Sequence, residues 1–505
     1  MLRVVQTENG LVRGIPAADP RITSFKGIPF AAPPVGANRW RAPQPCESWE
    51  GERDCARFAP ISMQETPGIG DVIYNREWHV DPEIPMSEDC LYLNVWTSAK
   101  SAGERQPVLV WFFGGGLQYG YPAEMEFDGE RLARRGIVVV SVNYRIGVLG
   151  YMAHPQLTRE QPEAPANFGS LDQQAGLRWV KRNIARFGGD PDNVTIAGQS
   201  AGGGSVLSQI GCKANAGLFH RAVVMSAMIR DPYGVREVGR PEPLAEAEQN
   251  GAAFLRFIGA ANLEEARTMD AAFIRDKYAE YMQKHRPMYT VLDGQFCTGD
   301  PLAQYLSCDC VDVPMMAGNT ADEFPNGLQV EDAARLSDAA AGCFGADAQR
   351  FLAFEESHVR GEAGFGTVNG IGLTVRGVFE RKARQGMKNY CYRFDADIPG
   401  WDHPGTFHSV DLWFFFETLA KCWRPFVGRH YDLSRQMCNY WANFIRSGDP
   451  NGADADGTPM PAWHAYTQET PCVMTFSGNG PNSADESPTP FERFLIDRVV
   501  GRIRV

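Results

Sequence analysis

The sequence predicts an α/β protein in which a mostly parallel sheet carries helices on both faces. Residues 108–112, 137–142 and 194–197 are almost unbroken runs of β-branched and apolar residues, as in strands buried on both faces. Segments with helical spacing of apolar residues, such as 172–185, alternate with these runs. The hydrophobic fraction of 44% and charged fraction of 22% are typical of a globular protein. Together these observations favour buried parallel strands joined by helices.

The other elements follow in chain order. Further strands are expected at 11–14, 22–25, 27–30, 91–96, 222–225, 314–318 and 390–394, and the Pro- and Gly-rich residues 60–86 are expected to form a surface loop over a site. Long helical segments at 242–290 and 330–386 are not needed for the sheet, so we interpret them as cap insertions. With no clear linker, residues 1–505 are interpreted as a single large catalytic domain.

Charge and cysteine content exclude several classes of function. The net charge is −12 and Lys and Arg form no dense run, which argues against a nucleic-acid partner. No stretch approaches the roughly 20 apolar residues that span a bilayer, and the first residues do not resemble a signal peptide. The twelve cysteines are scattered without a zinc pattern, so we expect free thiols, a reducing cytoplasmic setting, no metal and no cofactor.

A Gly-x-Ser-x-Gly pattern follows the predicted strand 194–197. Strand, sharp turn and helix start are typical of a nucleophile elbow, in which Ser200 has a strained backbone and needs small neighbours such as Gly198 and Gly202. The helix N-terminus beneath Ser200 would favour developing negative charge. Because the chain has 52 glycines, the pattern needs support from other residues.

A second glycine cluster, residues 114–116, closes the predicted strand 108–112. Ligands of such sheets bind off the carboxyl ends of the strands, so this cluster and the elbow are expected to face one crevice. The N–H groups of Gly115, Gly116 and Ala201 are then candidate donors of an oxyanion hole.

A base and an acid are expected on loops after later strands. His403 and His408 both follow the predicted strand at 390–394, and position alone does not separate them. Asp322 and Glu323 both follow the strand at 314–318. The order serine, acid, histidine along the chain is that of the α/β-hydrolases.

Over nearly its full length the chain resembles the type-B carboxylesterase family, which includes the cholinesterases. The resemblance rests on collinear motifs at residues 25–30, 33–36, 87–95, 143–150, 183–191, 440–444 and 448–451. It implies a serine carboxylesterase that forms an acyl-enzyme, with Glu323 as the acid and His408 as the base beside Ser200. It also implies that Gly115, Gly116 and Ala201 form the oxyanion hole.

Several positions depart from the family pattern. Gln199 stands where the family commonly has Glu, which removes a negative charge beside Ser200 and favours neutral esters over choline esters. Phe113 replaces the usual His or Tyr, and Phe324 follows Glu323 where Gly is common. Ser62 takes the place of a cysteine that pairs, in secreted members, with the one matching Cys90; this agrees with a reducing compartment.

The expected partner is a small, neutral, apolar or aromatic ester, bound by a monomer or homodimer. Candidate pocket residues are Phe113, Tyr119, Gln199, Trp413 and Phe416. Two alternatives remain open: thioesterase or peptidase activity on the same residues, and a non-catalytic adhesion or scaffold module of the same fold.

Overall fold

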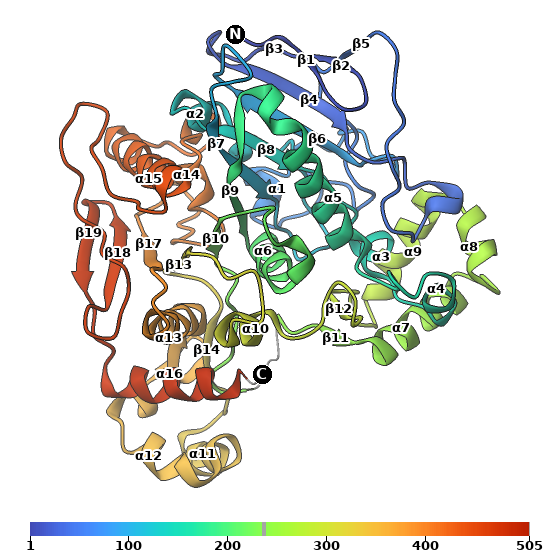
Figure 1. Cartoon of the computed structure of the whole chain (residues 1–505). Helices are drawn as coiled ribbons and strands as arrows, with labels where there is room; N and C mark the ends of the chain where they lie inside the picture. Colours follow the sequence, from blue (N-terminus) through green and yellow to red (C-terminus); the bar gives the residue numbers. More distant parts are fainter. Residues whose placement is uncertain (235–238, 504–505) are drawn as a thin grey trace.

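The computed structural model describes residues 1–234 and 239–503, and in this part of the chain an eleven-stranded sheet runs through the molecule (Figure 1). The order across it is β19-β18-β17-β13-β10-β9-β7-β8-β6-β4-β3. The run from β8 to β18 is parallel, whereas β19 at one edge and β6, β4 and β3 at the other are antiparallel to their neighbours. The strands are β3 (Ile15–Pro16), β4 (Thr23–Pro29), β6 (Tyr92–Thr97), β7 (Gln106–Phe112), β8 (Val138–Val142), β9 (Gly189–Gln199), β10 (Arg221–Met225), β13 (Met315–Thr320), β17 (Tyr390–Asp395), β18 (Cys472–Ser477) and β19 (Gly480–Asp485).

Helices cover both faces of the sheet, which confirms the predicted architecture. On one face lie α5 (Phe168–Asn183), α6 (Ala201–Gly211), α10 (Pro301–Ser307) and α13 (Gly370–Arg384), and on the other α2 (Glu130–Arg134), α14 (Leu412–Phe415) and α15 (Gly428–Ser447) (Figure 1). The valines at 108 and 138–140 are completely buried because helices pack on both sides of these strands. No helix of the described residues is long and apolar enough to cross a membrane.

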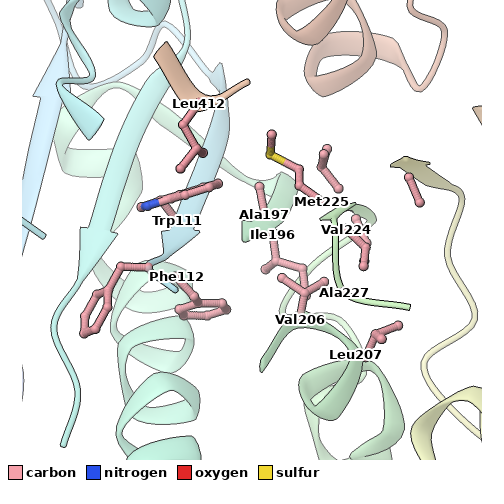
Figure 2. Packing of buried hydrophobic residues seen from close by; sticks show 14 of the residues in the cluster. Trp111, Phe112, Ile196, Ala197, Val206, Leu207, Val224, Met225, Ala227 and Leu412 are labelled. Carbon is pink, nitrogen blue, oxygen red and sulfur yellow. The ribbon is translucent and has the colours of Figure 1, made fainter. Parts of the chain in front are cut away.

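The apolar core continues directly beneath the turn between β9 and α6. Figure 2 shows buried side chains from β7, β9, β10 and α6, including Trp111, Ile196, Val206, Val224 and Met225. Such close packing holds the end of β9 and the start of α6 in a fixed geometry. The turn between them is therefore presented from a rigid support.

The two predicted insertions differ in structure. Residues 242–290 contain three helices, α7 (Leu244–Phe257), α8 (Leu263–Thr268) and α9 (Ala271–Met282). Residues 330–386 contain α11 (Leu336–Phe344) and α12 (Ala348–Leu352), but their last part is α13, which packs against β13, β17 and α16 (Pro490–Arg502). At Gly377 a Cβ would lie 2.4 Å from Val500 Cγ2, so glycine allows α13 and α16 to approach closely. We therefore assign α13 to the helical layer of the sheet and not to a cap.

Smaller elements surround this framework. They comprise β1 (Val4–Gln6), β2 (Leu11–Arg13) and β5 (Glu52–Asp54) in one sheet, β11 (Glu242–Pro243) and β12 (Val291–Leu292) in another, β14 (Pro325–Leu328), β15 (Arg360–Gly361) and β16 (Gly364–Asn369) in a third, and the helices α1 (Tyr74–Glu77), α3 (Gly147–Tyr151) and α4 (Pro155–Glu160).

The segment 60–86 is held to the body of the protein by a buried charge cluster. Arg424 forms ion pairs of 2.7 Å with Glu77 and 2.9 Å with Asp402, and the Arg424 and Glu77 side chains have no exposed surface. An unpaired charge here would be costly, so each partner needs the others. The cluster anchors α1 and its neighbour Trp78 beside the loop that carries the late histidines.

Candidate active site

Ser200 stands at the turn between β9 and α6 with a strained backbone. Its φ and ψ are 56° and −127°, values that few non-glycine residues adopt. The Ser200 N–H donates to Met225 O at 2.9 Å, which ties the turn to the neighbouring strand. A Cβ would lie 2.3 Å from Gly202 O at Gly198 and 2.2 Å from Phe112 O at Gly202, so both positions require glycine. The side chain of Ser200 is left partly exposed at the carboxyl edge of the sheet.

Glu323 and His408 meet beside this turn. The Glu323 carboxylate is hydrogen-bonded to His408 Nδ1 and also accepts hydrogen bonds from Ser226 Oγ and Thr320 N, both at 2.8 Å. Its side chain has no exposed surface. These donors hold the carboxylate in one orientation, and a proton on Nδ1 of His408 would leave a free lone pair on Nε2.

The alternative residues lie elsewhere. Asp322 accepts hydrogen bonds from Thr406 N at 2.9 Å and Thr406 Oγ1 at 3.0 Å, so it joins the loop after β13 to the loop before His408. His403 is exposed to solvent. The structure thus brings together Glu323 and His408, and gives Asp322 a role in holding the two loops.

His408 Nε2 faces Gln199 in this conformation. The Gln199 side-chain amide nitrogen lies 3.2 Å from His408 Nε2. Within the described residues no hydrogen bond joins Ser200 Oγ to His408. Hydrogen bonds of an active site are often unformed before substrate binds, and Ser200 directly follows Gln199 in the chain.

The loop 114–116 lies against the turn that carries Ser200. A Cβ at Gly114 would be 2.7 Å from Gln199 O and 3.3 Å from Ser200 Cβ. Gly115 and Gly116 have φ of 97° and 63°, a backbone that glycine adopts readily. In the described part of the chain, no acceptor is hydrogen-bonded to the N–H of Gly115, Gly116 or Ala201. Three unused donors therefore lie on the two segments that meet at Ser200.

Of the five predicted pocket residues, Tyr119 is exposed and the other four are buried. Tyr119 is 37% exposed, and its hydroxyl donates to Glu65 at 3.2 Å. Phe113 is buried and stacks on Tyr144, with ring centroids 4.2 Å apart.

The structure corrects the expectation that Trp413 and Phe416 line the pocket, because both side chains are fully buried in the core. The Phe416 ring centroid lies 5.0 Å from that of Trp111 and 5.3 Å from that of Trp441. In this conformation neither Trp413 nor Phe416 has surface left to contact a ligand, and Phe113 offers almost none.

Other residues near His408 were not identified from the sequence as site residues. The Phe324 ring centroid lies 4.5 Å from that of His408. Trp78 packs on Phe407 and Trp413, at 6.4 and 6.2 Å between centroids, which brings the irregular segment 60–86 to the histidine loop. Their only sequence signals are the unusual residue after Glu323 and the aromatic content of that segment.

Asp411 is a second buried carboxyl group close to Glu323. Burial, and next the charge of Glu323, raise the pKa of Asp411 to about 7. The Tyr392 hydroxyl donates to Asp411 Oδ2 at 3.0 Å. The neutral acid is thus the favoured form of Asp411 in the folded protein below about pH 7.

This raised pKa predicts a pH-dependent effect of Asp411→Asn on stability. Folding takes up a proton at Asp411 between its usual pKa near 4 and about 7, so its contribution is present below pH 4 and is lost as pH rises through 7. The neutral amide of the variant does not titrate, so its free energy of unfolding does not fall in this way. The difference in unfolding free energy between the variant and wild type should grow in favour of the variant by about 1.4 kcal/mol per pH unit across that window. Chemical denaturation at pH 5 and pH 8 measures it.

Asp497→Asn is the matched control, because its side chain is 63% exposed. The difference between this variant and wild type should be the same at both pH values. A constant difference for Asp411→Asn as well would show that Asp411 is ionised in the folded protein.

The described residues contain no group of three or more His, Cys, Asp or Glu side chains placed to hold a metal ion. All twelve cysteines are free, and Cys90 Sγ lies 3.4 Å from Ser62 Oγ. The hydroxyl group therefore stands where the resemblance places a disulfide partner.

Comparisons with known proteins agree with this fold. The model of the carboxylesterase family matches residues 2–345 and 371–489. The chain is 31% identical over 473 residues to fumonisin B1 esterase of Sphingopyxis macrogoltabida, covering 89% of this chain and 82% of the relative. It is 31% identical over 504 residues to human cocaine esterase, covering 92% of this chain and 86% of the relative.

A solved structure shares the whole architecture. The crystal structure of a Geobacillus stearothermophilus carboxylesterase aligns with a TM-score of 0.75 and 29% identity, over 98% of this chain and 100% of that one. The sheet and helical layers described above are therefore those of an α/β-hydrolase. The chain belongs to the carboxylesterase family and is a carboxylic ester hydrolase.

Proposed function

We propose that this esterase is a serine hydrolase in which Ser200, Glu323 and His408 form a catalytic triad that cleaves neutral esters through an acyl-enzyme. The observation that carries the proposal is the buried Glu323–His408 hydrogen bond beside the strained turn of Ser200. A base oriented by a buried carboxylate, next to a partly exposed serine, is the arrangement that activates a serine nucleophile.

In the proposed mechanism, Ser200 Oγ attacks the ester carbonyl carbon while His408 Nε2 takes the hydroxyl proton. Glu323 keeps the other imidazole proton on Nδ1 and stabilises the imidazolium that forms. His408 then gives its proton to the leaving alcohol oxygen, and an acyl group remains on Ser200. A water molecule, deprotonated by His408, then attacks the acyl carbon; the bond to Ser200 Oγ breaks, His408 returns the proton to Oγ, and the carboxylic acid leaves.

We assign the oxyanion hole to the N–H groups of Gly115, Gly116 and Ala201. Negative charge develops on the carbonyl oxygen during attack, and unused N–H donors stabilise it best when they are already in place. Such a donor is worth about 3 kcal/mol of barrier. The free donors on two rigidly supported turns support this assignment.

Gln199 supports the choice of a neutral ester. Its amide contacts His408 Nε2, and it brings no negative charge to the site, unlike the Glu common in the family. To allow attack, the Gln199 amide must give up this contact to the Ser200 hydroxyl. An ionised carboxylate at position 199 has no hydrogen to donate to the lone pair of a neutral imidazole, so glutamate would not make this contact.

Thioesters and amides present the same carbonyl to the same residues, so thioesterase and peptidase activity remain alternatives for the substrate class. A non-catalytic scaffold role would leave the buried Glu323–His408 pair unexplained.

We also propose a reducing, cytoplasmic setting, supported by Ser62 beside Cys90.

One experiment tests the proposal directly. The purified protein is treated with a serine-directed fluorophosphonate, digested and mapped by mass spectrometry, and in parallel assayed on p-nitrophenyl esters of increasing acyl length. We expect one adduct, on Ser200, and loss of esterase activity in proportion to labelling. Hydrolysis that persists in fully labelled protein, or an adduct on another serine, would refute it.

A further inference from the structure

Three features combine at Phe324, the residue that follows Glu323. Its φ is 39°, a value in the left-handed region that bulky residues rarely adopt. Its side chain is 48% exposed although it is a large apolar group. Its ring lies against the imidazole of His408, with centroids 4.5 Å apart and planes inclined by 51°.

The backbone at Phe324 is strained for two independent reasons. A positive φ places its Cβ in a crowded position, and the following residue, Pro325, restricts its predecessor to extended conformations. Strain of this kind costs about 1–3 kcal/mol and persists only where the surroundings impose it.

The flanking residues impose this conformation. On one side Glu323 is held by Ser226, Thr320 and His408, as described above. On the other, Pro325 opposes Asn369 in the pairing of β14 with β16, and Asn369 Nδ2 donates to Glu323 O at 3.4 Å. Glycine would fit this turn without strain, so stability alone does not account for phenylalanine here.

The location of the ring indicates which part of a substrate it meets. In the proposed mechanism His408 transfers its proton to the oxygen of the leaving alcohol, so that oxygen must come within hydrogen-bond reach of the imidazole. A ring in contact with the imidazole and half exposed to solvent therefore lies beside the alcohol portion of the ester. The ring carries no hydrogen-bonding group and attracts apolar, above all aromatic, surface.

We propose that Phe324 is a specificity-determining residue that contacts the alcohol portion of the ester and selects esters of apolar, aromatic alcohols. The inference rests on the proposed function, because it uses the role of His408 as the proton donor to the leaving alcohol. The strained backbone at residue 324 is then retained because it aims the ring at the leaving group.

The test compares two substrates that share one acyl group, benzyl acetate and ethyl acetate. Both give the same acetyl-enzyme, so deacylation is common to the two and the ratio of their kcat/KM values reports only on the alcohol. In Phe324→Gly this ratio should fall about tenfold from its wild-type value. Phe324→Tyr retains the ring and should keep the ratio close to wild type.

Phe58→Ala is the matched control, since Phe58 is an aromatic residue with 37% exposure whose ring packs near Trp96 and Lys26. Its ratio should equal that of wild type.

Thermal unfolding provides a second readout. Phe324→Gly should unfold at the same temperature as wild type or at a higher one. Phe324→Ala, which keeps the strained Cβ and loses the ring, should unfold at a lower temperature.

The outcomes separate this inference from the proposed function. An equal loss of activity on both acetates in Phe324→Gly, with Ser200 still labelled by the fluorophosphonate, would show that the ring only positions His408, and would overturn the inference alone. Failure of the wild-type protein to be labelled at Ser200 would overturn the proposed function, and the inference with it.

Discussion

Ser200→Ala is expected to lower the turnover of p-nitrophenyl acetate by about four to six orders of magnitude. The methyl group cannot attack the carbonyl, and the residual rate would come from the oxyanion-hole donors and substrate binding alone. The fold should be unaffected, because alanine keeps a Cβ at the same strained turn, where Ser200 has φ of 56°, and the N–H still bonds Met225 O. Steady-state kinetics with circular dichroism measures both effects.

Ser208→Ala provides the matched control for this experiment. Ser208 lies on the same helix, α6, and its hydroxyl donates to Gly204 O at 3.0 Å, within the helix itself. We expect near-wild-type turnover from this variant. If Ser200→Ala also retained near-wild-type turnover while folded, Ser200 could not be the nucleophile.

The second large effect concerns the two late histidines. His408→Ala should lower kcat by a factor comparable to that of Ser200→Ala, because the two residues act as a unit and the loss of either removes the activated nucleophile. His403→Ala should change kcat only slightly, since His403 is exposed and lies outside the contacts made by Glu323.

The double variant Ser200→Ala/His408→Ala makes this comparison sharper. If the residues act together, its turnover should be close to that of either single variant and not the product of the two losses. A severe defect in His403→Ala with a mild one in His408→Ala would instead assign the base to His403 and break the proposed link to Glu323.

The sequence by itself determined most of the framework of the protein. The runs at 108–112 and 194–197 are apolar on both faces, a composition typical of strands in a covered parallel sheet. The turn around Ser200 was equally visible as a Gly-x-Ser-x-Gly pattern, although glycine is required at position 202 by a contact with Phe112 O on the neighbouring strand. The sequence predicted these features because each is a requirement on the residues themselves: apolar faces that must be buried, and positions where a Cβ does not fit.

Other elements depended on their neighbours in space. The residues of β19 include glycine, proline and aspartate and have little strand propensity, yet they pair with β18 along its full length. The helix α13 resembled part of an insertion until its contacts with β13 and β17 placed it on the sheet. Tertiary pairing and burial outweigh local propensity in both elements.

In the active site, too, some features followed from the sequence and others only from the tertiary structure. From the residues alone, Asp322 competed with Glu323 and His403 with His408, and only the resemblance to a family separated them. In the folded chain Asp322 bonds Thr406, whereas Glu323 bonds His408. The burial of Trp413 and Phe416, the contact of Gln199 with His408, and the ring of Phe324 against the imidazole were decided by the tertiary structure. Each depends on where side chains from separate strands and loops meet in space, and the spacing of residues along the sequence does not give the distances between such side chains.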